Sequence, residues 1–237
     1  MGGGPPQVPP GEDNSLGEDE GDDNEGEGAV TAANPMTALA MWLSGGLSEY
    51  NKLLETNPTT TKIVTSGVIG ALGDLFSQLL EGKDKNEKSV DFRRLLIFTL
   101  SAALYFAPVI GAWFTFLNNV PIPGGDGAKA LGMLLIDQTA GAMSVIGTYF
   151  FFYEFIDHLI PGGSACEPGM NPLASIVSRG THSLKHTLPN VLVANWKVWP
   201  VVNFLNFRFV PPMYQLLVSN LASFFWNVYL AGATVKR

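Results

Sequence analysis

The fold is decided by one uncharged stretch of 23 residues, residues 95–117, with the sequence LLIFTLSAALYFAPVIGAWFTFL. As an α-helix rising about 1.5 Å per residue it is roughly 35 Å long, enough to cross a hydrocarbon core of roughly 30 Å. In lipid the backbone N–H and C=O groups find no water, and a helix satisfies them within the segment. The stretch therefore predicts a transmembrane helix, with a local kink at Pro108 because proline lacks the N–H that the helix needs.

Three further apolar stretches have about the length of a membrane crossing, namely residues 63–80, 132–155 and 213–233. Two amphipathic segments lie beside them. Residues 38–56 carry apolar side chains near helical spacing, and residues 173–199 alternate apolar with basic side chains. The second segment is typical of an interfacial or partly inserted helix, ended by Trp199-Pro200. The pattern predicts an all-α, polytopic integral membrane protein with about four transmembrane helices plus amphipathic interfacial helices.

The composition agrees with a membrane protein that carries an acidic tail. The chain is 46% hydrophobic and only 15% charged, against roughly 25% charged residues in soluble domains. Residues 1–30 hold nine acidic and no basic side chains, whereas the rest is nearly neutral. We expect residues 1–35 to be a disordered acidic tail and residues 36–237 to be a single membrane-embedded helical domain. No dense Lys/Arg patch indicates nucleic-acid binding.

Polar and small residues form a stripe along one face of three predicted crossings. Because residues three or four apart share a helix face, each set points in one direction. Such stripes let helices approach closely and hydrogen-bond across the contact. The stripes comprise Ser66, Gly70, Asp74 and Gln78 in the first crossing; Asp137, its neighbour Gln138, Gly141, Ser144 and Thr148 in the third; and Asn220, Ser223 and Asn227 in the fourth.

The two acids of these stripes, Asp74 and Asp137, allow two interpretations. A carboxylate within a bilayer costs a few kcal/mol on insertion scales, so both should face the bundle interior or a water-filled path and have a partner. One interpretation makes them pore-lining or proton-relay groups, and the other makes them interhelical hydrogen-bond anchors. The candidate partners are Gln78, Gln138, Asn220, Asn227, Arg93 and Arg94.

Signals for enzymatic chemistry are absent from the sequence. No nucleotide-binding, nucleophile-elbow or zinc-protease motif occurs. His182 and His186 have a metal-compatible spacing but lack a third ligand nearby, so we interpret them as solvated or headgroup-facing. We therefore expect no catalytic site, no metal site and no cofactor.

The end of the chain resembles a known family. Trp199, Pro200, Asn206, Phe207 and Pro211, followed by Trp226 and Asn227, stand in the pattern of the Mpv/PMP family. These are small integral membrane proteins named for a twenty-two-kilodalton peroxisomal protein and its mitochondrial inner-membrane relatives. Weaker matches occur in order from about residue 42 to residue 230. The chain departs from the family pattern at several positions, among them Asn203, where the family usually has Gln, and Gln215, where it usually has Arg.

The resemblance implies a four-crossing protein of an organelle membrane. It favours the mitochondrial inner membrane, with peroxisomal and plastid membranes as alternatives. Members are similar to weakly selective channels or are tied to organelle homeostasis. We therefore expect a channel for small solutes or ions, in which Asp74, Gln78, Asp137, Gln138, Asn220 and Asn227 line the pore or join helices. The alternative is a non-conducting membrane scaffold or assembly factor. The expected partners are the lipid bilayer, further copies of the chain in a homo-oligomer, and the solute of a channel.

Overall fold

The computed structural model describes residues 1–4, 35–85, 90–164 and 169–234. All regular structure in these residues is helical, and the predicted all-α class is confirmed. Most of the predicted acidic tail, residues 5–34, lies outside the described residues. Residues 1–45 and 46–237 are separate compact units, and the second unit contains the candidate site.

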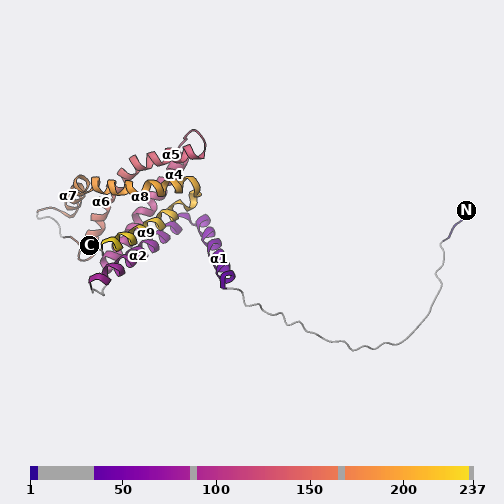
Figure 1. Ribbon diagram of the computed structural model, residues 1–237, viewed down its shortest axis with the longest axis horizontal. Helices are drawn as coiled ribbons and strands as arrows, with labels where there is room; N and C mark the ends of the chain where they lie inside the picture. Colours follow the sequence, from indigo (N-terminus) through magenta and orange to yellow (C-terminus); the bar gives the residue numbers. More distant parts are fainter. Residues whose placement is uncertain (5–34, 86–89, 165–168, 235–237) are drawn as a thin grey trace, which may run out of the picture. The chain divides into compact units, whose positions relative to one another are not determined.

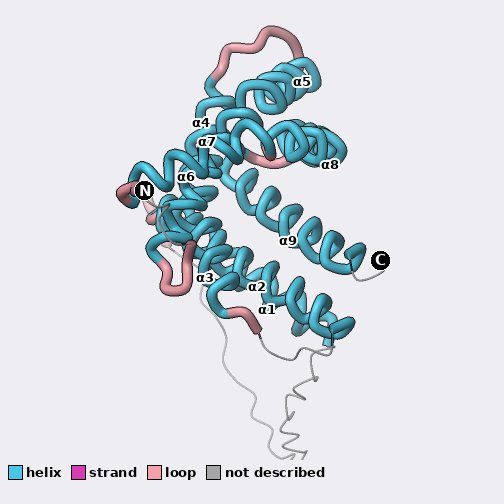
Figure 2. The backbone as a smooth tube through the Cα atoms, turned by 90° about the vertical axis from the view of Figure 1, so that its left-hand side faces the viewer, coloured by secondary structure: helices cyan, strands magenta, loops and turns pink. Residues whose placement is uncertain are grey.

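Helices follow one another with short connections throughout the described residues (Figures 1 and 2). Some of them begin at side chains that cap a helix. Asp91 Oδ1 accepts a hydrogen bond from the Arg94 N–H, and Asn171 Oδ1 accepts one from the Ala174 N–H. The elements are α1 (Pro35–Thr56), α2 (Pro58–Lys85), α3 (Phe92–Leu100), the π-helix η1 (Ser101–Phe106), α4 (Ala107–Asn119), α5 (Asp126–Ile136), the π-helix η2 (Asp137–Gly141), α6 (Ala142–Leu159), α7 (Pro172–His186), α8 (Leu188–Phe209), the 3₁₀-helix η3 (Pro212–Tyr214) and α9 (Gln215–Thr234).

Three continuous helical segments of the described chain are long and apolar enough to cross a membrane: Pro58–Gly82, Phe92–Asn119 and Asp126–Leu159. They contain the first three predicted crossings. The fourth, residues 213–233, coincides with η3 and α9. Because α9 is not among those three, its crossing stays a prediction.

The second crossing accommodates Pro108 by a change of helix type. The π-helix η1 ends two residues before Pro108, and α4 then carries the proline in its first turn. Proline in a helix interior clashes with the carbonyl four residues earlier, here that of Leu104 in η1. Widening the preceding turn is a known way to relieve such a clash. At the position of the expected kink, the structure therefore has a π-helical turn before Pro108.

The amphipathic segment 173–199 needs a correction, because the structure divides it and extends it. The first helix, α7, ends at His186, and α8 begins at Leu188 with Pro189 in its first turn, where a missing N–H costs nothing. Pro200 does not end α8, which runs on to Phe209. The continuation buries Asn203 and Asn206, and we infer that these contacts outweigh the one backbone hydrogen bond that Pro200 removes.

Close packing of α2 depends on its glycines. The helix lies beside α9 (Figure 1) and also against η1. A Cβ at Gly70 would stand 2.6 Å from the Ala102 Cβ of η1, and one at Gly67 would stand 3.3 Å from the Ala103 Cβ. The small residues of the predicted stripe thus set how closely these helices approach.

Exposed and buried side chains are distributed as lipid requires. Outward-facing apolar side chains recur on α2 and α9, whereas many fully buried side chains are polar. In a bilayer this arrangement leaves hydrocarbon against lipid and hydrogen-bonding groups against one another. The exposed residues include Val64, Val68, Leu72, Phe76, Leu221 and Phe225; the buried polar residues include Ser66, Asp74, Asn203, Asn206, Gln215 and Ser219.

Candidate functional site

Asp137 lies at the first position of η2 and is held by three neutral donors. The Trp113 indole Nε1–H donates to Oδ1 at 2.9 Å. The amide groups of Gln138 and Asn203 donate to Oδ2 at 2.8 Å and 2.7 Å. These donors come from α4, η2 and α8. The neighbouring Gln138 and two residues from helices distant in sequence therefore converge on one carboxylate, which is 7% exposed.

The charge of Asp137 has no partner among the described residues, since no Lys, Arg or His of these lies within ion-pair distance. Beside the carboxylate, the buried Asn203 Oδ1 accepts no hydrogen bond from the described part of the chain. Both groups offer oxygen acceptors. The site therefore favours a cation or a hydrogen-bond donor.

The Asp137 site opens onto a cavity of about 460 Å³, walled by α2, α3, η1, α4, η2, α6, α8 and α9. All three predicted polar stripes contribute to its lining. Asp137 is the only charged residue among the lining residues, and most of the remaining lining is apolar or aromatic. The polar lining residues are Ser66, Ser101, Asp137, Gln138, Asn195, Asn203, Ser219, Asn220, Ser223 and Asn227.

Two predicted site residues, Asp74 and Gln78, do not line this cavity. The Arg94 Nε lies 2.7 Å from Asp74 Oδ1, and Gln78 Nε2 donates to Asp74 Oδ2 at 2.7 Å. Arg94 also pairs with Glu81, and Gln78 binds the backbone of Asp91. The contacts join the end of α2 to the start of α3. Asp74 therefore lies in a neutralised polar cluster between helices.

The other predicted polar residues join helices near the cavity. Asn220 on α9 donates to Ser66 Oγ on α2 at 2.7 Å. Asn227 lines the cavity close to Gly73. Gln138 accepts from Asn195 at 3.1 Å and, through its backbone carbonyl, from the Trp196 indole, so it also connects η2 with α8.

The residues of the C-terminal pattern form the turn from α8 to α9 and part of the cavity wall. Asn206 is fully buried and donates to the Gln215 carbonyl and to Ser219 Oγ. Phe207 meets Phe114 edge to face. Trp199 and Trp226 line the cavity, Pro200 lies inside α8, and Pro211 precedes η3.

Sequence reasoning missed several residues of these sites. Asn203 was noted only as a departure from the family pattern and Trp113 was not singled out, yet both donate to Asp137. Asp157 lies just past the predicted third crossing and pairs with Arg93, while Glu154 pairs with Arg179 between α6 and α7. The sequence did contain a signal for these two ion pairs, because an acidic residue at the end of a crossing and a basic residue in a neighbouring segment indicate a pair. His182 and His186 stack at 4.5 Å, and no group of three metal-ligating side chains occurs among the described residues.

Comparisons with known proteins agree with the resemblance. Residues 176–231 match the family model described as Mpv17 / PMP22 family. The chain is 29% identical to the mitochondrial inner membrane protein Mpv17 of Caenorhabditis briggsae, over 79% of this chain and 92% of that protein. It is 29% identical to peroxisomal membrane protein 2 of Bos taurus, over 78% and 88%. It is 26% identical to human Mpv17, over 81% and 97%.

No solved structure matches the chain. The relatives are proteins of mitochondrial and peroxisomal membranes, and the described chain has apolar helices of membrane-spanning length. It is therefore an integral protein of an organelle membrane, surrounded by the lipid bilayer. The chain is thus similar to the Mpv17 / PMP22 family, by the family model near its C-terminal end and by these relatives over most of its length.

Proposed function

We propose that this protein is a weakly selective channel for small solutes or ions, with Asp137 as its charge-selecting group. One observation carries the proposal: a cavity of about 460 Å³ collects the polar faces of α2, η2 and α9 inside a bundle whose outer faces are apolar. At about 30 Å³ per water molecule the cavity has room for roughly 15 waters, so it suits solutes of a few heavy atoms or hydrated ions.

The electrostatics of the cavity favour cations over anions. Asp137 is bound by neutral donors only, so its negative charge is not cancelled by any described neighbour. Acidic groups along a pore attract cations and repel anions. The proposal applies equally to a monomer and to a homo-oligomer, and it places the protein in the mitochondrial inner membrane by likeness to the Mpv17 proteins. It assigns no enzymatic activity.

Reconstitution into planar bilayers under a potassium chloride gradient tests the channel. Wild type should conduct with a reversal potential displaced toward that of potassium. Asp137→Asn should conduct with a reversal potential near zero. Asp126→Asn is a matched control, because Asp126 lies outside the cavity and is exposed. The absence of conductance in wild type at all voltages would refute the channel.

The second candidate, a non-conducting scaffold, is favoured by the Asp74 cluster, where the ion pairs of Arg94 join α3 to α2 and Asp74 does not line the larger cavity. It predicts that Asp137→Asn is folded and fully active in cells that lack the native protein. Loss of cellular function in a well-folded Asp137→Asn variant would count against it.

A further inference from the structure

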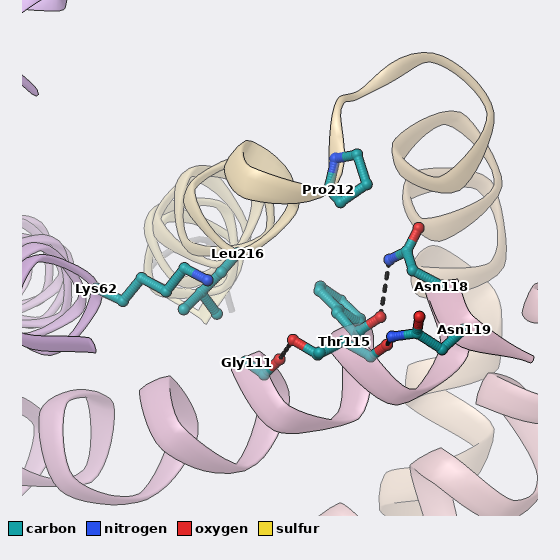
Figure 3. Close-up of a pocket in the computed structure, with 8 residues that line it drawn as sticks. Lys62, Gly111, Thr115, Asn118, Asn119, Pro212 and Leu216 are labelled. Atoms are coloured by element: carbon teal, nitrogen blue, oxygen red, sulfur yellow. Dashed lines mark hydrogen bonds between the residues drawn. The ribbon is translucent and has the colours of Figure 1, made fainter. Parts of the chain in front are cut away.

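A second cavity, of about 290 Å³, lies where the start of α2, the end of α4 and the start of α9 meet (Figure 3). Lys62 of α2 borders it on one side, and Gly111, Thr115, Asn118 and Asn119 of α4 border it on another. None of its lining residues except Phe114 belongs to the larger cavity. A role for this second cavity is therefore independent of the proposed channel.

Among the residues that the structure describes, Lys62 is the only charged one that lines the second cavity. Its half-buried side chain extends toward Leu216, across from the α4 residues (Figure 3). No carboxylate of the described residues lies within ion-pair distance of its ammonium group. A partly desolvated cation without a counterion is costly, and an anion in the cavity would remove that cost.

A second cation reaches the same region, since Lys129 donates from its Nζ to the Asn118 carbonyl at 3.2 Å. Asn118 is itself fixed, because its Nδ2 donates to Gln215 Oε1 at 2.8 Å and to the Phe114 carbonyl. Lys129 thus binds a residue of the same helix end that borders the cavity beside Lys62. This arrangement raises the local preference for an anion.

The cavity is kept open by Gly111. A Cβ at this position would meet only Leu216 Cδ2, at 3.9 Å, so a larger side chain would grow into the free space. Thr115, which also lines the cavity, donates its hydroxyl proton to the Gly111 carbonyl within α4 (Figure 3). The space equals roughly ten water molecules at about 30 Å³ each, which is enough for a phosphate group with several waters.

The position of the second cavity along the membrane-length helices also favours a phosphate group. It lies near one end of two membrane-length segments, since Pro58–Gly82 begins four residues before Lys62 and Phe92–Asn119 ends at Asn119. Ends of membrane-spanning helices stand at the level of the lipid headgroups, where phosphate is the abundant anion and Lys side chains reach toward it.

We propose that this cavity binds a phosphate group through the ammonium group of Lys62. The phosphate belongs either to a membrane lipid headgroup or to a free phosphate ion. Lys serves in such sites as a point charge rather than as a bidentate ligand. Arg at position 62 should therefore preserve binding, whereas an uncharged side chain of similar length should not.

The first experiment measures thermal unfolding of the full chain in a non-ionic detergent, with inorganic phosphate or with chloride at equal ionic strength. Phosphate should raise the unfolding midpoint of wild type and of Lys62→Arg. In Lys62→Met and in Gly111→Leu, which fills the cavity, the apparent affinity should fall roughly tenfold or more. Lys197→Met is the matched control, because Lys197 is exposed on α8 and lies outside the cavity.

The second experiment counts bound lipids by native mass spectrometry after reconstitution with phosphatidylcholine alone or with added phosphatidic acid. If wild type retains phosphatidic acid and Lys62→Met does not, and inorganic phosphate leaves the unfolding midpoint unchanged, the site binds lipid headgroups. A response to inorganic phosphate that is lost in the same variant assigns it to a free ion. If Lys62→Met and Gly111→Leu behave as wild type in both experiments, the proposal is wrong.

Discussion

Two buried aspartates of the same bundle, Asp74 and Asp137, are stabilised in different ways. Asp74 pairs with the Arg94 guanidinium, and its side chain is fully buried. Asp137 is held by an indole and two amides and borders the larger cavity. Both acids lie in a polar stripe of a predicted crossing, so the sequence pattern treats them alike. Their surroundings separate them into a neutralised cluster and a charged site.

The difference shows where a membrane bundle can keep a net charge. A carboxylate that only joins helices is best neutralised, because an unpaired charge in lipid costs several kcal/mol. A carboxylate beside a cavity can be stabilised by oriented donors while its charge still acts on the cavity. Asp74 thus fits an anchoring role and Asp137 fits a selecting role.

The largest effect is expected for Arg94→Leu. This change leaves the Asp74 carboxylate buried with Gln78 as its remaining side-chain donor. Removing one partner of a buried pair costs about 3–5 kcal/mol, and the stability of the detergent-solubilised protein should fall by that amount in a denaturation titration. Arg208→Leu is the control, because Arg208 pairs at 3.4 Å with Asp126, which is 84% exposed, and such pairs contribute at most about 1 kcal/mol. Equal losses in the two variants would show that Arg94 does not anchor Asp74.

The next effect concerns the two glycines that lie one helical turn from the acids. A Cβ at Gly70 would stand 2.6 Å from Ala102 Cβ, and one at Gly141 would stand 2.7 Å from the Trp113 Nε1 that donates to Asp137. Overpacking costs about 1–3 kcal/mol, so Gly70→Ala and Gly141→Ala should both be destabilised in the same titration. Gly46→Ala should not be destabilised, because a Cβ at Gly46 would have no atom of the described residues within 4 Å.

The two glycine variants should differ in function. Gly141→Ala pushes the indole away from Asp137, whereas Gly70→Ala wedges α2 from η1 near the other acid. If Asp137 alone selects ions, the reversal potential should shift in Gly141→Ala and stay unchanged in Gly70→Ala. The reverse pattern, or a shift in both, would contradict the separation of roles.

The sequence was sufficient to predict the helical class and the main crossings, because lipid imposes one strong constraint. Every backbone polar group must be satisfied internally, so apolar length alone identifies helices such as Phe92–Asn119. Local rules were less reliable. Pro200 was expected to end a helix, but α8 continues through it, because tertiary burial of Asn203 and Asn206 outweighs the local preference.

The partners of the two acids were only partly predictable. Gln78 and Gln138 were candidate partners by proximity in sequence, and both donate to their acids. Arg93 and Arg94 were equal candidates for Asp74, but in the structure Arg94 pairs with Asp74 while Arg93 pairs with Asp157. Asn203 lies 66 residues from Asp137. A contact between residues so far apart depends on how α8 packs against η2, which no local pattern specifies.

The smallest effect comes from the two glutamines, which donate to the two acids at nearly equal distance. Gln78→Leu removes one donor from Asp74, which retains the Arg94 cation. Gln138→Leu removes one donor from Asp137, which retains two neutral donors and no cation among the described residues. A hydrogen bond to a charged group contributes more where nothing else compensates the charge. Both glutamines have further contacts, Gln138 with Asn195 and Gln78 with the Asp91 backbone, so double-mutant cycles with Asp137→Asn and Asp74→Asn isolate the bond of each glutamine to its acid. The coupling energy of Gln138 with Asp137 should exceed that of Gln78 with Asp74 by about 1 kcal/mol. If the two coupling energies are equal, the two carboxylates are equally well compensated, and the assignment of separate roles fails.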